Sequence, residues 1–269
     1  MPEGHTLHRL ALAHRREFVG APVAVSSPQG RFAAAAQAVD GRTLTDVQAH
    51  GKHLFQHYGP FGTVHIHLGL YGSFVSYEKP VTPPVGKVRM RMVGNSHWAD
   101  LRGPIRCELL SQPETNAIVD NLGPDPLRDD ADSERAWQRI TRSRAALSTL
   151  LLDQKVLAGV GNVYRAEVLF RHGVPPSLPG NALERKTWQA IWEDLVMLMG
   201  VGVRSGRIDT VREEHMPAAT GRAPRQDRHG GEVYVYRRTG QPCLVCATPV
   251  EHCERGNRNL YWCPHCQRW

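Results

Sequence analysis

The sequence contains no long apolar run. No window approaches the roughly 18 consecutive apolar residues that a membrane-spanning helix needs, and the opening MPEGHTLHRL lacks the apolar stretch of a secretory signal. We therefore expect no membrane partner and a cytoplasmic protein. The bias typical of disordered tails is also missing, because 41% of the 269 residues are hydrophobic. This length exceeds one domain of roughly 100–150 residues and favours two.

Motifs for nucleotide cofactors are missing as well. The glycine turn at residues 159–162 has neither the spacing of a dinucleotide fingerprint nor a P-loop lysine, so we expect no nucleotide cofactor. Positive charge, by contrast, is in excess: 33 Lys and Arg stand against 26 Asp and Glu, with a pI near 9.3. The excess favours encounter with a polyanion, nucleic acid first, although a merely soluble surface explains the charge equally well.

Hydrophobic periodicity indicates a mainly β first domain. Leu7 and Ala11 fall on one side of a short helix predicted over residues 1–18. Apolar and polar residues then alternate, as in residues 64–70 and 88–92, with turn signals at short intervals. This pattern is typical of half-buried strands in a sandwich or barrel.

The second half of the chain begins as helices. Apolar side chains recur at three- and four-residue spacing in residues 137–151 and 188–199. Residues 205–231 predict a long exposed loop, and residues 233–236 a short strand. The polar stretch before the helices predicts a linker with little to add to a core. The predicted division is a β domain at 1–122, a linker at 123–133, a helical domain at 134–231 and a terminal hairpin at 232–269.

Four of the six cysteines stand in two pairs, Cys243-x2-Cys246 and Cys263-x2-Cys266, separated by 16 residues. Each pair presents two thiolates on one tight turn, and together they complete the closed tetrahedron that structural zinc requires. Disulfides are the alternative, but nothing suggests an oxidising compartment, and a redox role would not need two matched pairs. We expect one structural Zn²⁺ per chain, which supplies folding free energy to a hairpin too small to bury a core.

Other residues near these motifs carry weaker signals. Cys107 and Cys253 are predicted to be ordinary thiols, and His65 and His67 to face solvent from one strand face rather than bind a metal. Arg258 lies in the basic and aromatic segment between the cysteine pairs, where its planar guanidinium can grip a phosphate. A solvated turn arginine is an equal explanation for Arg258 alone.

The glycine turn predicts an anion site. One helix is expected to end at Gly159 and a second to begin near Asn162. The backbone amides in the first turn of the second helix have no partners within that helix and favour an anion. Asn162 can cap that helix or turn its side-chain amide toward the same phosphate.

The N-terminus offers a candidate nucleophile. Removal of Met1 would leave Pro2 with a free α-amino group, whose reference pKa of about 7.7–8.0 leaves a fraction unprotonated at neutral pH. A secondary amine can attack a sugar carbon and leave a charged imine, with Glu3 placed beside it to shuttle a proton. A good helix start is the plain alternative for both residues.

These features occur in the order of one known family. Its motifs here are Met1-Pro-Glu-Gly4, His50-Gly-Lys52-His-Leu, Gly69-Leu70-Tyr71-Gly72, the glycine turn and the cysteine pairs. Over nearly its whole length the chain resembles the formamidopyrimidine-DNA glycosylase/endonuclease VIII repair enzymes, in particular the endonuclease VIII-like branch. The resemblance implies an α+β fold: an N-terminal antiparallel β-sandwich with a leading helix, then a helix-two-turn-helix domain with a zinc β-hairpin.

The resemblance also implies the chemistry. It predicts a bifunctional DNA glycosylase/AP lyase of base excision repair that removes oxidised bases, pyrimidines favoured. Pro2 would attack C1′ of the lesion nucleotide, Glu3 would act as acid and base, and the imine would permit β- and δ-elimination. Lys52 would face a phosphate next to the lesion.

The remaining residues implied by the resemblance hold DNA. Asn162 and Arg258 would clamp phosphates, while Leu70 and Tyr71 would enter the stack that the flipped lesion vacates; the alternative is that Leu70 continues the buried strand face. We expect damaged DNA, duplex or single-stranded, as partner of a monomer. A non-catalytic zinc-finger DNA-binding protein on the same scaffold is the rival hypothesis.

Two positions depart from the family pattern. Gly69 stands where endonuclease VIII commonly has glutamine, and Thr6 where members often carry a further acidic residue. If that acid assists the reaction, His5 or Thr6 must compensate for it.

Overall fold

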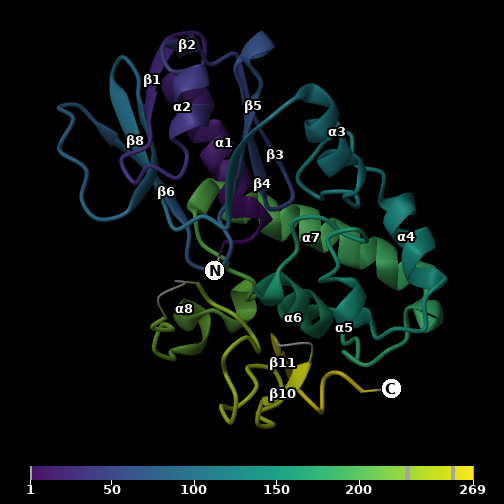
Figure 1. Cartoon of the computed structure of the whole chain (residues 1–269). Helices are drawn as coiled ribbons and strands as arrows, with labels where there is room; N and C mark the ends of the chain where they lie inside the picture. Colours follow the sequence, from purple (N-terminus) through teal and green to yellow (C-terminus); the bar gives the residue numbers. More distant parts are fainter. Residues whose placement is uncertain (1, 228–230, 256–257, 269) are drawn as a thin grey trace. The chain divides into compact units, whose positions relative to one another are not determined.

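The chain divides into two compact units, Met1–Asn121 and Leu122–Trp269, and each is described by itself. The computed structural model describes residues 2–227, 231–255 and 258–268 (Figure 1). Within these ranges, no helix combines the length and the apolar character that crossing a bilayer requires.

The first unit begins with helix α1 (Gly4–Phe18), which confirms the predicted leading helix. Its buried face carries Leu7, Ala11, His14 and Phe18, at the three- and four-residue spacing of one helix side. Val19 adopts an extended conformation and ends the helix.

Two antiparallel sheets follow, as the predicted sandwich requires, and their buried residues form one shared core. The five-stranded sheet has the order β2-β1-β7-β8-β6 and the four-stranded sheet the order β3-β4-β5-β9. Helix α1 packs on β3 and β4 of the smaller sheet (Figure 1). The strands are β1 (Pro22–Ser26), β2 (Arg42–Thr43), β3 (Asp46–His50), β4 (His53–His57), β5 (Thr63–His67), β6 (Ser73–Glu78), β7 (Val88–Val93), β8 (His97–Arg102) and β9 (Arg106–Leu110), with α2 (Ala33–Val39), η1 (Gly59–Phe61) and α3 (Gln112–Asp120) between or after them.

The predicted alternation of buried and exposed residues is wrong in two strands. In β5, His65 is only 1% exposed, so the prediction that it faces solvent is incorrect. In β7, Arg91 is buried and its Nε and Nη2 donate to Asp100 at 2.7 and 2.8 Å. Every residue of both strands is buried or half-buried. The polar side chains are tolerated there because each has a partner on a neighbouring strand.

Helices build the second unit, in agreement with the sequence. They surround one core that includes Trp188, Ile191 and Leu195 of the longest helix. That helix ends at Gly206, whose left-handed conformation (φ 74°) suits glycine. The elements are α4 (Ser133–Thr141), α5 (Leu147–Leu150), α6 (Asn162–Arg171), η2 (Gly180–Ala182), α7 (Arg185–Ser205), η3 (Glu213–His215), α8 (Pro217–Thr220), β10 (Glu251–Arg255) and β11 (Arg258–Trp262).

The predicted linker at 123–133 belongs to the second unit and is partly buried. Residues 123–126 are buried, and Leu127 packs against the core. Gly123 N donates to Gln154 O at 2.9 Å, and Ala158 N donates to Pro124 O at 3.0 Å. The prediction that a helix ends at Gly159 is wrong, because α5 ends at Leu150 and turns follow it. These backbone hydrogen bonds bury a polar segment that lacks apolar periodicity.

The expected exposed loop at 205–231 is more ordered than its composition suggests. It contains η3 and α8, and Ile208 and Thr210 are buried. Residues 228–230 of that prediction lie outside the described residues.

Candidate active site and zinc hairpin

The candidate nucleophile lies at the start of α1. Pro2 is half-buried, directly before Glu3, which caps the helix in an extended conformation and is fully buried. Thr6 N donates to the Glu3 carbonyl oxygen at 2.9 Å and closes the first turn. Met1, whose removal the chemistry requires, lies outside the described residues. The helix therefore holds the Glu3 carboxyl group away from bulk water, next to residue 2.

His5 and Thr6 are the residues expected to compensate for the acidic residue missing at position 6. His5 is buried, and burial, followed by the positive charges of the chain terminus and Arg9, lowers its pKa to about 4. Thr6 Oγ1 lies 3.4 Å from His5 Nε2. At neutral pH His5 is uncharged, so it can exchange hydrogen bonds but does not replace the charge of a carboxylate.

Lys52 lies in a tight turn between β3 and β4. The strands pair from Asp46 and His57 up to His50 and His53, which leaves Gly51 and Lys52 as the two turn residues. Gly51 has a positive φ of 57°, as such hairpin turns require. Because α1 packs on both strands of this hairpin, Glu3 and Lys52 belong to neighbouring elements of the same unit.

A chain of polar side chains supports this hairpin and was missed from the sequence. His53 Nδ1 lies 2.8 Å from His65 Nε2, and His65 Nδ1 lies 3.0 Å from Glu108 Oε1. The period-two pattern of β5 concealed it, because that pattern predicted solvent at His65.

The predicted wedge residues lie in the turn between β5 and β6. Tyr71 is 91% exposed and Leu70 44% exposed, so Leu70 does not continue the buried strand face. Gly69 has a φ of 69°, and a Cβ there would come within 2.3 Å of Ile105. A Cβ at Gly72 would come within 2.3 Å of the Leu68 carbonyl oxygen. The turn thus requires both glycines, and a glutamine at position 69 would not fit this conformation.

The four predicted zinc ligands come together in the second unit. The Sγ atoms of Cys243, Cys246, Cys263 and Cys266 all lie within 4.8 Å of one another. Tetrahedral zinc with Zn–S bonds of about 2.3 Å places its sulfurs about 3.8 Å apart, close to this spacing. Val245 N and Cys266 N donate to the Sγ atoms of Cys243 and Cys263 at 3.5 and 3.4 Å, which favours thiolates. The donor set fits one structural Zn²⁺.

Of the two remaining cysteines, Cys107 is half-buried and Cys253 is exposed on β10. Burial raises the pKa of Cys107 to about 12, so this thiol is inert at neutral pH.

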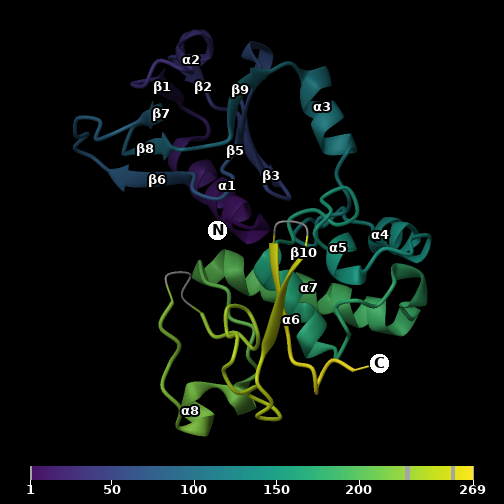
Figure 2. The ribbon, with the colours of Figure 1, turned by 60° about the horizontal axis from the view of Figure 1, so that its bottom comes forward.

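Asn162 anchors the zinc hairpin to α6. It is buried, and its Nδ2 donates to the Asn259 carbonyl oxygen of β11 at 2.9 Å. Arg165 donates to the Asn162 side-chain oxygen and, at 3.2 Å, to the same Asn259 oxygen. Gly161, not Asn162, is the cap of α6. Figure 2 shows the hairpin alongside this helix. Arg258, the first residue of β11, is exposed.

A buried carboxylate organises the segment before the hairpin. Glu167 Oε1 accepts from the amides of Val235 and Tyr236 at 2.9 and 2.8 Å. Its Oε2 accepts from Tyr234 N and from Thr210 Oγ1, both at 2.6 Å. Residues 233–236 therefore do not form the predicted strand, because three successive amides turn toward one carboxylate.

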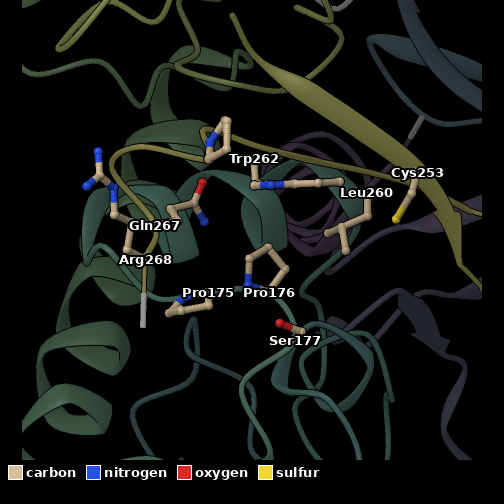
Figure 3. A pocket seen from close by; sticks show the side chains of 9 residues that line it. Pro175, Pro176, Ser177, Cys253, Leu260, Trp262, Gln267 and Arg268 are labelled. Carbon is tan, nitrogen blue, oxygen red and sulfur yellow. The ribbon is translucent and has the colours of Figure 1, made fainter. Parts of the chain in front are cut away.

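A pocket of about 470 Å³ opens beside the hairpin (Figure 3). Its walls are Leu260 and Trp262 of β11, Cys253 of β10 and the segment Pro175–Ser177 that follows α6. Residues two apart along a strand share a face, so Arg258 projects from the same face of β11 as the pocket wall.

Comparison with known proteins identifies the family. The chain matches the formamidopyrimidine-DNA glycosylase N-terminal domain at residues 1–107, the H2TH domain of that enzyme at 122–213, and a zinc finger found in FPG and IleRS at 240–268. It is 52% identical over 271 residues to "Endonuclease 8 1" of Mycobacterium tuberculosis, which covers 99% of this chain and 100% of the relative. It is 32% identical to the formamidopyrimidine-DNA glycosylase of Albidiferax ferrireducens, over 85% of this chain and 83% of the relative. The chain belongs to the formamidopyrimidine-DNA glycosylase/endonuclease 8 family.

Solved structures of the family share the fold. The Lactococcus lactis Fpg in complex with DNA containing an abasic site superposes with a TM-score of 0.80 at 20% identity, covering 99% of this chain and 100% of that one. The Thermus thermophilus Fpg gives 0.76 at 24% identity, covering 99% and 98%. The family consists of DNA glycosylases with AP lyase activity, and the chain is accordingly a DNA glycosylase/AP lyase of base excision repair with a zinc finger.

Proposed function

We propose that this enzyme removes oxidised bases, pyrimidines favoured, through an imine formed by Pro2. The observation that carries the proposal is the pairing of Pro2 with the fully buried Glu3 at the start of α1. The unprotonated Pro2 nitrogen attacks C1′, and the glycosidic bond breaks with its electrons on the departing base. The hydrogen of the Pro2 N–H then leaves as a proton, which neutralises the departing base. Glu3 donates a proton to O4′ as the sugar ring opens, which leaves a positively charged imine between Pro2 and C1′.

The imine then makes elimination possible. Its positive charge acidifies the C2′ hydrogen, and loss of that proton expels the 3′ phosphate in the β step. A second proton loss expels the 5′ phosphate in the δ step, so the strand is nicked on both sides of the lesion. Glu3, after donating its proton, is the carboxylate positioned to accept one.

Three residues are proposed to hold phosphates. Lys52 projects from a rigid two-residue turn, where its ammonium offsets the negative charge next to the lesion. Asn162 uses one side-chain N–H to hold β11, and an amide nitrogen carries a second N–H that a phosphate can accept from. Arg258 is exposed on the hairpin. Such contacts fix the strand without reading sequence.

Leu70 and Tyr71 are proposed to fill the stack that the lesion leaves. Flipping a nucleotide costs a few kcal/mol, and the exposed apolar turn can offset part of this cost by stacking in the gap. The preference for oxidised pyrimidines rests on the Pro2-Glu3-Gly4 and Leu70-Tyr71 motifs, which resemble those of the endonuclease VIII-like branch.

Zinc, when bound, supplies no reaction step and stabilises the hairpin. The four cysteines hold it, Asn162 and Arg165 fasten the hairpin to α6, and the Glu167 contacts order the chain that leads into it. The proposal includes a monomer that acts on duplex or single-stranded damaged DNA in the cytoplasm, at the nucleoid.

The test uses oligonucleotides with an abasic site or with defined oxidised bases, in single- and double-stranded form. We expect borohydride to trap a covalent complex with the abasic DNA, and Pro2→Gly to reduce trapping sharply while Pro60→Gly, an exposed proline of the same unit, leaves it unchanged. Correctly processed protein that binds DNA but yields no trapped complex would favour the rival DNA-binding protein. A panel that cleaves oxidised purines faster than oxidised pyrimidines would overturn the substrate preference.

A further inference from the structure

Three side chains of the first unit form a hydrogen-bonded chain that the proposed reaction does not use. His53, His65 and Glu108 come from β4, β5 and β9, which are neighbours in one sheet. The distances are 2.8 Å between His53 Nδ1 and His65 Nε2, and 3.0 Å between His65 Nδ1 and Glu108 Oε1. His65 is buried at the centre, whereas Glu108 reaches the surface with 37% of its side chain exposed. We call this set the relay.

Donor and acceptor chemistry fixes where the protons of the relay lie. A carboxylate only accepts, so His65 Nδ1 carries the hydrogen that is donated to Glu108. In the neutral form His65 Nε2 then holds a lone pair, to which His53 must donate through its Nδ1 hydrogen. The other ring nitrogen of His53, Nε2, is consequently an acceptor.

One added proton reverses this arrangement. When His53 Nε2 gains a hydrogen, the Nδ1–H bond of His53 breaks and an N–H bond forms at His65 Nε2. The positive charge then lies on His65, beside the Glu108 carboxylate, and His53 Nε2 has become a donor. The relay thus changes His53 from acceptor to donor and pairs the new charge with a carboxylate.

We propose that the relay takes up one proton from the solvent when a DNA phosphate binds at the Lys52 turn, so that His53 donates to the phosphate beside the Lys52 ammonium. The inference rests on the proposed phosphate role of Lys52. His53 directly follows Lys52 and is the first residue of β4. It is half-buried, and its ring lies edge to edge with the His65 ring, with 19° between the two planes and centroids 5.1 Å apart. These contacts hold the ring in one orientation next to the turn.

Burial, together with positive neighbours, keeps the relay neutral until an anion arrives. Burial, followed by its positively charged neighbours, lowers the pKa of His53 to about 3, and burial also lowers the pKa of His65. A phosphate nearby favours the protonated form. The groups that face the relay are Lys52 in the turn, His50 on β3, His67 on β5 and Arg106 on β9.

The sign of the pH effect follows from this. DNA raises the pKa of the relay above its value in the free protein. The DNA affinity gained from proton uptake is therefore absent when the pH is above the pKa of the relay in the complex. It grows as the pH falls through that pKa and is complete below about pH 3, the pKa of free His53.

The experiment is calorimetric titration of the full chain with a duplex carrying a tetrahydrofuran abasic analogue. Titrations from about pH 8 to about pH 5, in buffers of different ionisation enthalpy, report the number of protons bound. We expect uptake approaching one proton per duplex at the acidic end, with affinity rising up to about tenfold per pH unit. Glu108→Gln keeps an acceptor for His65 but no negative charge, so uptake should fall and the slope flatten. Glu78→Gln, which removes an exposed carboxylate on β6, should keep the wild-type slope.

Equal proton uptake in the wild type and Glu108→Gln would overturn the proposal, as would a Glu108→Gln affinity reduced by the same factor at every pH. If Glu108→Gln fails to fold by circular dichroism, His53→Gln replaces it, because its amide can still donate to His65 but cannot be protonated. Borohydride trapping tests the Pro2 reaction separately. Wild-type trapping without linked proton uptake would therefore reject the relay alone.

Discussion

The Glu167 contacts allow a quantitative prediction about what holds the zinc hairpin in place. Glu167→Gln replaces one carboxylate oxygen with an NH₂ group, which then faces two donors. With the NH₂ group at the Oε2 position, Tyr234 N loses its acceptor, whereas the Thr210 hydroxyl can donate to the Glu232 carbonyl oxygen and accept from the NH₂ group; with the NH₂ group at the Oε1 position, Val235 N and Tyr236 N both lose their acceptor. The first orientation loses one hydrogen bond, and a hydrogen bond to a charged group contributes about 1.5–3 kcal/mol, so the substitution should cost the second unit at least about 1.5–3 kcal/mol.

The assay is guanidinium unfolding of the full chain, followed by zinc release to a chromogenic chelator and by circular dichroism. Zinc release should begin at lower denaturant in Glu167→Gln, while the transition of the first unit stays in place. Glu193→Gln on α7 is the matched control, because it removes an exposed carboxylate and should change stability by less than about 0.5 kcal/mol. If both variants release zinc at the same denaturant concentration, the carboxylate does not organise the segment and the reasoning fails.

Three further predictions concern zinc, phosphate and pH. Chelation of zinc, or Cys246→Ser, should unfold the terminal hairpin and weaken DNA binding while circular dichroism still reports a folded sandwich; metal-free protein with full affinity would contradict this. DNA affinity should fall with salt, and Arg258→Ala should make the log–log slope shallower by about one; an unchanged slope removes Arg258 from the phosphate contacts. Burial lowers the pKa of His14 from 6.5 to about 4 in the folded protein, so as the pH falls the unfolded chain takes up a proton at His14 before the folded protein does. The free energy of unfolding should therefore fall by up to about 3 kcal/mol between pH 6.5 and 4, and His14→Leu should reduce this fall. If denaturant titrations give the wild type and His14→Leu the same dependence of unfolding free energy on pH, His14 is not its source.

Features that depend only on residues close together in the sequence were predictable. The Cys-x2-Cys spacing predicts the cluster because each pair needs only a local turn, and the Lys52 hairpin and helix α1 likewise depend on adjacent residues. The exposure of Tyr71 follows from two glycines that force a turn. Each of these signals is local, so one sequence sufficed.

The errors arose where a distant partner decides the structure. Residues 233–236 have the composition of a strand, but their amides bind Glu167, 67 to 69 positions earlier in the chain. His65 fits an exposed strand position until Glu108, 43 residues away, provides an acceptor that permits burial. Residues 123–126, Gly-Pro-Asp-Pro, offer little apolar surface, yet they are buried and joined to residues 154 and 158 by backbone hydrogen bonds. Periodicity does not report such pairings, because it records only spacing along the chain.

The account depends most on covalent bond formation at the second residue. The direct measurement is peptide mass spectrometry of the borohydride-reduced complex between active enzyme and abasic DNA. We predict an N-terminal peptide that lacks Met1 and carries the sugar remnant on the Pro2 nitrogen. An adduct located on Lys52 or another lysine, or undiminished strand cleavage by protein that retains Met1, would contradict the mechanism.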